Sequence, residues 1–248
     1  MKSAVPSKRA KRSRPFVAVT FAMTVDGKIT TKNFAAVDFT SREDKAHLIR
    51  QRALGDAVLI GYGTLRQDNV RLGIPREELR NERIARGQSP YPLRVIVSSS
   101  GRIDPTLNLF QTEFAPILIF STTRMPQKTR QQLRSKATLH LSDSPAVDLG
   151  WMLRQLRYDY ALKRVACEGG AVLFRSLLER GLVDQLNLTI APFVFGGRNA
   201  PTLTGVTFEF LPRSVRCSLR AMKVIGEECF LTYRLRPAHA VHPQPHPL

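Results

Sequence analysis

The sequence predicts an α/β domain: a mixed, mostly parallel central sheet with helices on both faces, in three layers, and an antiparallel hairpin at its C-terminal end. Two observations support this class. Between Pro15 and Arg236, apolar runs of strand length alternate with segments of helical periodicity, a pattern typical of open sheets covered by helices. The last two apolar runs have no helix between them and meet near Gly226, which predicts a hairpin.

Eight segments have the length and composition of strands. Several are rich in Val and Ile and are bounded by Gly, Pro or Ser, as strands usually are. In chain order they span residues 16–22, 56–61, 93–99, 115–120, 164–168, 185–191, 215–224 and 228–235.

Helical periodicity lies between these strands. Residues 41–54, 148–158 and 170–180 carry apolar side chains at helical spacing, and Ser41 or Thr40 can cap the first of them. We expect another helix to begin near Thr64. Residues 73–92 are polar and basic, and we expect a long surface loop or a short helix there.

The composition indicates one folded body with a tail at each end. The chain has 248 residues, of which 43% are hydrophobic and 23% charged, as in globular domains. Residues 1–14 contain six Lys or Arg and no acid, which predicts a basic disordered arm. Residues 237–248 are rich in Pro and His, which predicts a disordered tail. The predicted domain is therefore 15–236.

The charge and the cysteines restrict the classes of partner. The formal net charge is +18, which favours anionic ligands such as phosphates and could favour nucleic acid. No apolar run reaches the roughly 18 residues of a membrane-spanning helix. Three scattered cysteines are too few for a disulfide framework or a zinc cage and suit a reducing cytosol. We therefore expect a cytoplasmic protein without a metal site.

Two strand–glycine–helix junctions are the strongest chemical signals. The first places Gly61 and Gly63 after an apolar strand, and the second places Gly169 and Gly170 after another. Glycine lets a ligand approach the backbone, and free N–H groups at a helix start attract phosphate. Neither junction fits G-x-G-x-x-G, because Arg66 stands at the last glycine position. Plain strand-to-helix turns are the alternative; together the junctions favour an extended phosphate-bearing ligand.

Two further turns follow predicted strands. Ser98-Ser99-Ser100-Gly101-Arg102 offers hydroxyls and a guanidinium that suit a phosphomonoester, with a simple polar turn as the alternative. Asp26-Gly27 is a turn signal, and Lys28 beside it could meet an anion or water.

Taken together, these segments resemble the riboflavin-biosynthesis reductase family (the RibD C-terminal reductase domain), whose fold is similar to dihydrofolate reductase. The resemblance implies an NADPH-dependent enzyme that reduces the ribosylamino sugar of a pyrimidine phosphate to a ribityl chain. It rests on TVDGK (24–28), GYGTLRQDN (61–69), LRVIVSS (93–99), CEGG (167–170), LVDQLNLTIAP (182–192) and FGG (195–197).

The resemblance also implies a set of site residues. Asp68 and Glu168 would be the catalytic carboxylates, although surface solvation or a helix cap explains an isolated carboxylate equally well. The residues implied in NADPH binding are Ala22, Thr24, Gly61, Gly63, Thr64, Asp68, Ser99, Arg102, Gly169 and Gly170. Those implied in substrate binding are Arg52, Leu72 and Glu168, with Arg71 and Arg76 as further candidates for its phosphate.

Some positions depart from the family pattern, so the exact substrate is less constrained than the fold and cofactor. Residues 35–38 lack the polar group common in the family, and Val70 replaces its proline. One alternative is an NADPH reductase for another pterin or carbonyl substrate, and a second is a nucleic-acid-binding protein on a silent reductase scaffold. Relatives are commonly dimers, so we expect a homodimer, whereas nucleic acid is a conceivable partner that we do not expect.

Overall fold

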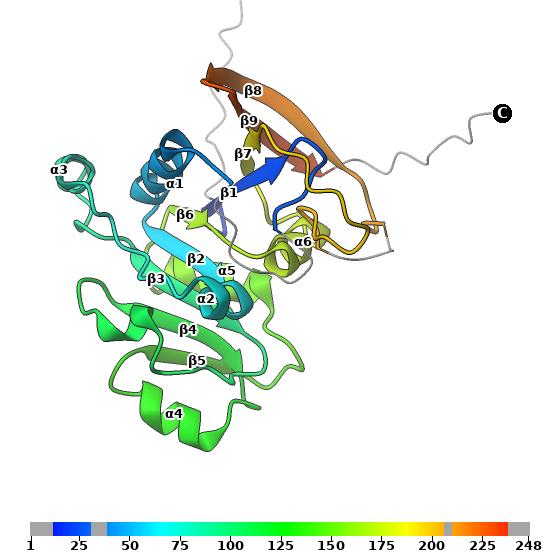
Figure 1. The fold of residues 1–248 in the computed structure, drawn as a ribbon. Coiled ribbons are helices and arrows are strands. Elements are labelled where there is room, and N and C mark those ends of the chain that lie inside the picture. The colour runs from blue at the N-terminus through cyan, green and yellow to red at the C-terminus, as the bar shows by residue number, and fades with distance from the viewer. Residues whose placement is uncertain (1–11, 31–38, 206–209, 238–248) are drawn as a thin grey trace, which may run out of the picture.

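A computed structural model describes residues 12–30, 39–205 and 210–237 (Figure 1). In this part of the chain nine strands form one sheet in the order β5-β4-β3-β2-β6-β1-β7-β9-β8. The strands from β5 to β7 are parallel, whereas β9 runs antiparallel to both of its neighbours. Their bounds are β1 Phe16–Thr24, β2 Ala57–Gly61, β3 Leu93–Ser98, β4 Ile117–Thr122, β5 Thr138–Ser142, β6 Arg164–Cys167, β7 Gln185–Ala191, β8 Val215–Ile225 and β9 Glu228–Pro237.

Helices cover both faces of the sheet, so the fold has three layers. Helices α5 and α6 pack on one face, where Leu153 and Leu177 join Val19 in a single core cluster. On the other face Leu65 of α2 packs with Ile60 and Ile119, while α1 and α3 form a smaller cluster. The helices are α1 Arg42–Leu54, α2 Tyr62–Asp68, α3 Glu77–Ala85, α4 Gln127–Leu133, α5 Leu149–Tyr158 and α6 Ala171–Glu179.

Local sequence explains where the long helices start. The Ser41 hydroxyl accepts hydrogen bonds from the amides of Glu43 and Asp44, each at 3.1 Å, and so caps α1. Asp148 caps α5 in the same way, and the apolar stripe of that helix is fully buried. Losing either cap would cost about 1 kcal/mol of stability.

The predicted fold class is confirmed, including the hairpin, whose turn residue Gly226 has φ +59°. The segment 73–92 contains the short helix α3. One expectation was wrong in detail: the helix after β2 begins at Tyr62, since the strand passes directly into it, and not near Thr64. Sequence reasoning also missed β5, an edge strand that is only partly buried, and α4, a polar helix in which only Leu133 is buried.

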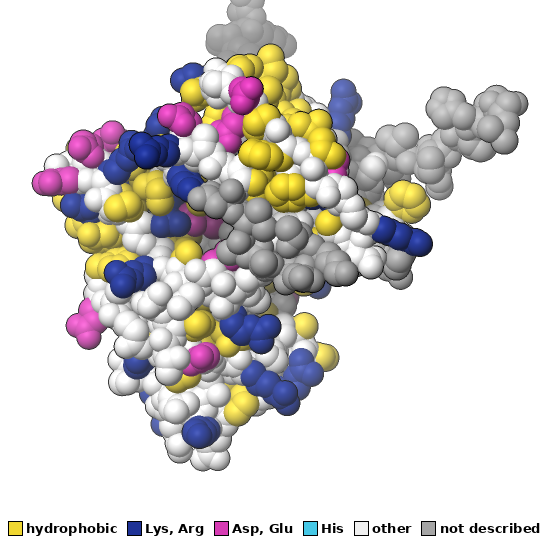
Figure 2. All heavy atoms as spheres, viewed as in Figure 1, with side chains coloured by type: hydrophobic (Ala, Val, Ile, Leu, Met, Phe, Trp, Pro, Cys, Tyr) yellow, Lys and Arg dark blue, Asp and Glu magenta, His cyan; other side chains and the backbone are white. Residues whose placement is uncertain are grey.

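The two predicted tails lie mostly outside the described residues. Of the arm 1–14, residues 12–14 are described, and Arg12 and Arg14 pair with Asp184 at 3.0 and 2.6 Å. Residues 1–11 and the tail 238–248 are not described. Within the described ranges no helix is long and apolar enough to cross a membrane. Figure 2 shows Lys and Arg scattered over one face of the molecule, with hydrophobic side chains gathered toward the end that carries β8.

Candidate active site

The candidate residues follow the carboxyl ends of neighbouring parallel strands. Thr24 ends β1, Gly61 ends β2, Ser99 follows β3 and Glu168 follows β6. Because these strands are parallel, the four positions share one edge of the sheet. Ligands of open α/β sheets bind at this edge, which makes it the candidate active site.

The two glycine junctions touch one another at this edge. Strands β2 and β6 are adjacent, and the amide of Glu168 donates to the Leu59 carbonyl at 3.0 Å. A Cβ atom on Gly169 would lie 2.9 Å from Cγ1 of Ile60, and one on Gly170 would lie 2.6 Å from Oγ1 of Thr64. Gly170 also has φ +78°, which side chains rarely adopt. The two junctions therefore form one continuous surface that only glycine permits.

Part of this surface is open to a ligand. Gly63 is exposed, and a Cβ atom there would meet nothing within 4 Å. Gly170 is the N-terminal cap of α6 and gives no side-chain hydrogen bond to that helix. The first amides of α6 therefore lack a side-chain cap, the arrangement that suits an anion.

Arg52 and Glu168 form a buried ion pair behind the junctions. The Nε and Nη2 atoms of Arg52 each donate to a different Glu168 oxygen at 2.7 Å, and Nη1 donates to the Gly73 carbonyl at 2.5 Å. The two side chains are only 9% and 6% exposed. Burial opposes the charged form of Arg52, but the Glu168 carboxylate more than offsets this and raises the pKa of Arg52. Arg52 thus fixes Glu168 and the loop that contains Gly73.

The loop after α2 contains the other substrate-side candidates. Asp68 ends α2 and is exposed, yet partial desolvation by nearby protein atoms raises its pKa. Leu72 has φ +59°, which is uncommon for a bulky side chain, and its side chain is buried in the core. A ligand could therefore meet Leu72 only through the backbone. Arg71 and Arg76 are exposed.

Hydrogen bonds connect the turn after β3 to neighbouring segments. The Ser99 hydroxyl accepts a hydrogen bond from the Val147 amide at 3.1 Å, and Thr122 donates to the Ser99 carbonyl at 2.8 Å. Gly101 has φ +63°, and a Cβ atom there would lie 2.4 Å from Cβ of Met125. Arg102 follows this rigid turn and is exposed.

Asp26 joins two loops of the edge, a role that its turn motif did not reveal. Its carboxylate accepts hydrogen bonds from the Thr24 hydroxyl at 2.5 Å and from the amides of Phe195 and Gly196 at 3.2 and 2.7 Å. The Thr24 hydroxyl is therefore committed to Asp26. Ala22, which lies two residues before Thr24 on β1, is paired in register with Thr189 on β7.

Acid should weaken the connection that Asp26 makes between these loops. The hydrogen bond from Thr24 lowers the pKa of Asp26. Partial desolvation opposes this shift, whereas the hydrogen bonds from the amides of Gly196 and Phe195 add to it. A lowered folded-state pKa means that the stabilisation is complete above the ordinary aspartate pKa and is lost as the pH falls through the lowered one. Thermal unfolding should show a Tm gap between wild type and Asp26→Asn that closes over this acid interval. A gap independent of pH would contradict the assignment.

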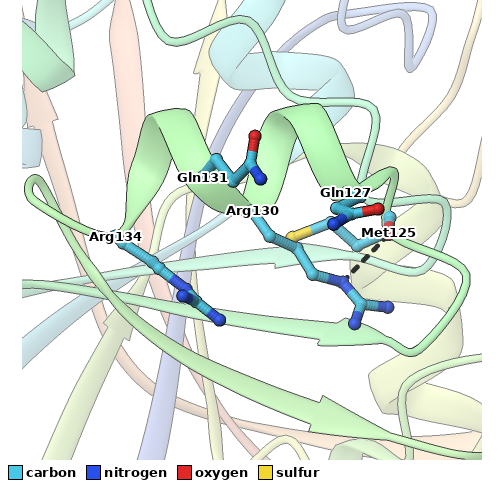
Figure 3. Close-up of a pocket in the computed structure, with 5 residues that line it drawn as sticks. All are labelled: Met125, Gln127, Arg130, Gln131 and Arg134. Carbon is cyan, nitrogen blue, oxygen red and sulfur yellow. Dashed lines mark hydrogen bonds between the residues drawn. The ribbon is translucent and has the colours of Figure 1, made fainter.

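Other polar groups have structural roles. Figure 3 shows a hollow beside α4, where the Arg130 guanidinium bonds the Met125 carbonyl at 3.0 Å; none of the predicted site residues lines it. His140 stacks on Phe120 and shares a hydrogen bond with Tyr160.

Burial raises the pKa of the Cys167 thiol to about 12, so Cys167 is a poor nucleophile. No group of His, Cys, Asp or Glu that could hold a metal occurs in the described ranges.

Comparison with known proteins identifies the family. Residues 15–231 match the RibD C-terminal domain family. The 2,5-diamino-6-ribosylamino-4(3H)-pyrimidinone 5′-phosphate reductase of Archaeoglobus fulgidus is 31% identical over 89% of this chain and 98% of its own length. The enzyme of the same name from Methanothermobacter thermautotrophicus is 30% identical over 90% of this chain and 99% of its own.

Solved structures support the same fold. A pyrimidine reductase-like protein from Corynebacterium diphtheriae superposes with a TM-score of 0.77 at 20% identity, covering 90% of this chain and 93% of that one. A riboflavin biosynthesis reductase from Saccharomyces cerevisiae gives 0.66 at 21% identity, covering 92% and 93%. The chain therefore belongs to the RibD C-terminal domain family, which contains reductases of riboflavin biosynthesis.

Proposed function

We propose that this protein is an NADPH-dependent reductase of 2,5-diamino-6-ribosylamino-4(3H)-pyrimidinone 5′-phosphate, or of the analogue 5-amino-6-(5-phosphoribosylamino)uracil, and that the hydride goes to the ribose C1. The names of the two relatives support the substrate class. The observation that carries the proposal is the contact between the two glycine junctions, because it creates one backbone surface for a dinucleotide diphosphate.

The residues at the edge fit NADPH. Gly63 is open, Gly169 and Gly170 carry no side chains, and the α6 amides lack a side-chain cap. On the sheet surface next to Ala22, the buried hydroxyl of Thr189 has no hydrogen-bond partner among the described residues. NADPH, when bound, supplies the hydride. The positions proposed to hold it are Ala22, Thr24, Gly61, Gly63, Thr64, Asp68, Ser99, Arg102, Gly169 and Gly170.

The two carboxylates have different environments, which suggests different tasks. The Glu168 carboxylate accepts hydrogen bonds from two N–H groups of Arg52. We therefore assign it the role of a fixed acceptor that orients the substrate. Partial desolvation raises the pKa of Asp68, which makes Asp68 the better group to hold and deliver a proton. Arg71 and Arg76 are the exposed candidates for the substrate phosphate, since three N–H groups of Arg52 already have partners.

Two measurements test the proposed reaction. NADPH, titrated by fluorescence, should bind more tightly than NADH, because Ser99 and Arg102 are assigned to the 2′-phosphate that NADH lacks. Absorbance should then show NADPH oxidation with the ribosylaminopyrimidinone phosphate and not with dihydrofolate. NADPH binding without turnover of the former would instead favour a reductase of another pterin or carbonyl substrate.

We also propose a cytoplasmic homodimer. The cytoplasmic assignment rests on three free thiols. The dimer rests on the edge strand β8, where Leu219, Met222 and Val224 are 51%, 64% and 59% exposed, since apolar edge strands are liable to pair. Met222→Glu should convert the dimer to a monomer in analytical ultracentrifugation, whereas Lys223→Glu, with its side chain on the opposite face of β8, should not. A dimer that survives Met222→Glu would place the interface elsewhere.

A further inference from the structure

A groove rich in arginine lies at the end of the sheet opposite the candidate active site. We call it the arginine groove; its lining includes Phe16, Asp184, Arg12, Arg220, Arg234 and Arg236. Phe16 begins β1 and Thr24 ends it. The strand has nine residues, so the groove and the candidate active site lie about 26 Å apart along it. The groove is therefore distinct from the proposed NADPH site.

Three guanidinium groups surround the ring of Phe16. Those of Arg234, Arg164 and Arg12 lie 4.5, 4.8 and 5.5 Å from the ring centroid. The four residues come from β9, β6, the segment before β1, and β1 itself. Stacking on an aromatic face positions a guanidinium while leaving its N–H groups able to bind.

The protein neutralises only part of the positive charge in the groove. Among the described residues Asp184 is the only acid that lines it, and its carboxylate already accepts hydrogen bonds from Arg14, Arg12 and the Val17 amide. The Nε of Arg164 is buried without a partner. In the described part of the chain, no hydrogen bond or ion pair engages the side chains of Arg220, Arg234 or Arg236.

Elsewhere two buried arginines, Arg83 and Arg94, donate several hydrogen bonds to protein acceptors, although the Nε of Arg94 has no partner. Arg83 donates to the carbonyls of Ser89, Ala53 and Gly55. Arg94 donates to the carbonyls of Leu109, Thr112 and Ala115 and to the Thr112 hydroxyl. The N–H groups of Arg220, Arg234 and Arg236 make no such bonds in the described residues and are therefore open to an external ligand with acceptor oxygens.

The ligand must also be extended. Arg12, Arg220, Arg234 and Arg236 come from three segments and offer several separate anion contacts. A single phosphate would neutralise only part of this charge, whereas a phosphodiester chain presents one anionic group per nucleotide. We propose that the arginine groove binds the backbone of nucleic acid without base specificity.

The test uses the full chain and a fluorescein-labelled oligouridylate of about 20 nucleotides, with affinity followed by anisotropy over a range of salt concentrations. The double variant Arg220→Ala/Arg236→Ala removes two exposed groove arginines. Its control, Arg134→Ala/Arg154→Ala, removes two exposed arginines, one at the C-terminal cap of α4 and one on α5, and changes the net charge by the same amount. The groove variant should lose about tenfold in affinity, and its logarithmic salt slope should fall by about 1.4, or about 0.7 for each lost phosphate contact on a single strand. The control should change neither.

Two further readouts separate this site from the reductase site. Saturating NADPH should not displace the oligonucleotide, and both double variants should oxidise NADPH at the wild-type rate. Equal losses in the two double variants would overturn the proposal, because the binding would then reflect net charge alone. Displacement by NADPH, or equally strong competition by inorganic tripolyphosphate, would overturn it as well.

Discussion

Replacing Gly63 with aspartate should weaken NADPH binding by about 30- to 1,000-fold, the equivalent of about 2–4 kcal/mol. The added carboxylate would face the diphosphate that the glycine junctions are proposed to hold. Two like charges about 4 Å apart repel by this amount at the effective dielectric constant of a protein surface. Fluorescence titration with NADPH measures the loss directly.

Gly63 is a suitable probe because the substitution should not disturb the fold. A Cβ atom at this position meets nothing within 4 Å, and its φ is not positive. Gly170→Ala is less informative, since its new methyl would lie 2.6 Å from the Thr64 hydroxyl and would be strained at φ +78°. Loss of binding in Gly170→Ala could therefore come from local rearrangement.

Matched variants at the same position separate charge from bulk. Gly63→Ala should bind NADPH nearly as well as wild type, and Gly63→Lys should keep most of the affinity, because its charge attracts phosphate. Wild-type thermal stability in all three variants would exclude unfolding as the cause. If aspartate and lysine weakened binding equally, the diphosphate would not lie against this junction.

The parts of the site that sequence could reveal are local. The Gly61–Thr64 and Glu168–Gly170 segments each lie at the end of a buried strand, and the two glycines of each segment are at most two positions apart, so both junctions could be identified from the chain alone. That they touch depends on β2 and β6 being neighbours. That order follows from the path of the whole chain through the sheet, which no local pattern encodes.

The parts that sequence could not reveal are long-range polar contacts. Arg52 and Glu168 are 116 residues apart, and the carboxylate of Asp26 reaches amides about 170 residues away. Arginine and aspartate are common on surfaces, so an isolated residue of either type carries little information before the fold places its partner. The arginine groove is a similar case, since Phe16 and its three guanidinium groups come from separate segments.

Arg52→Met should both destabilise the protein and reduce its activity. The change leaves the Glu168 carboxylate buried without its cation, and breaking a buried pair in this way costs about 3–5 kcal/mol of unfolding free energy. Glu168 would also lose the two hydrogen bonds that fix its orientation. We expect kcat/KM for the pyrimidine substrate to fall about 100-fold, equivalent to about 2.7 kcal/mol. Urea unfolding and steady-state kinetics measure the two effects.

A double-mutant cycle then decides how Arg52 acts. If Arg52 works through Glu168, then Arg52→Met/Glu168→Gln should be no less active than Glu168→Gln alone, and it should be more stable than Arg52→Met because no buried charge is left unpaired. If Arg52 binds the substrate phosphate directly, adding Arg52→Met to Glu168→Gln should raise KM for the substrate further while leaving KM for NADPH unchanged. The three hydrogen bonds that Arg52 donates to Glu168 and Gly73 favour the first result, in which Arg52 is a positioning residue for the carboxylate.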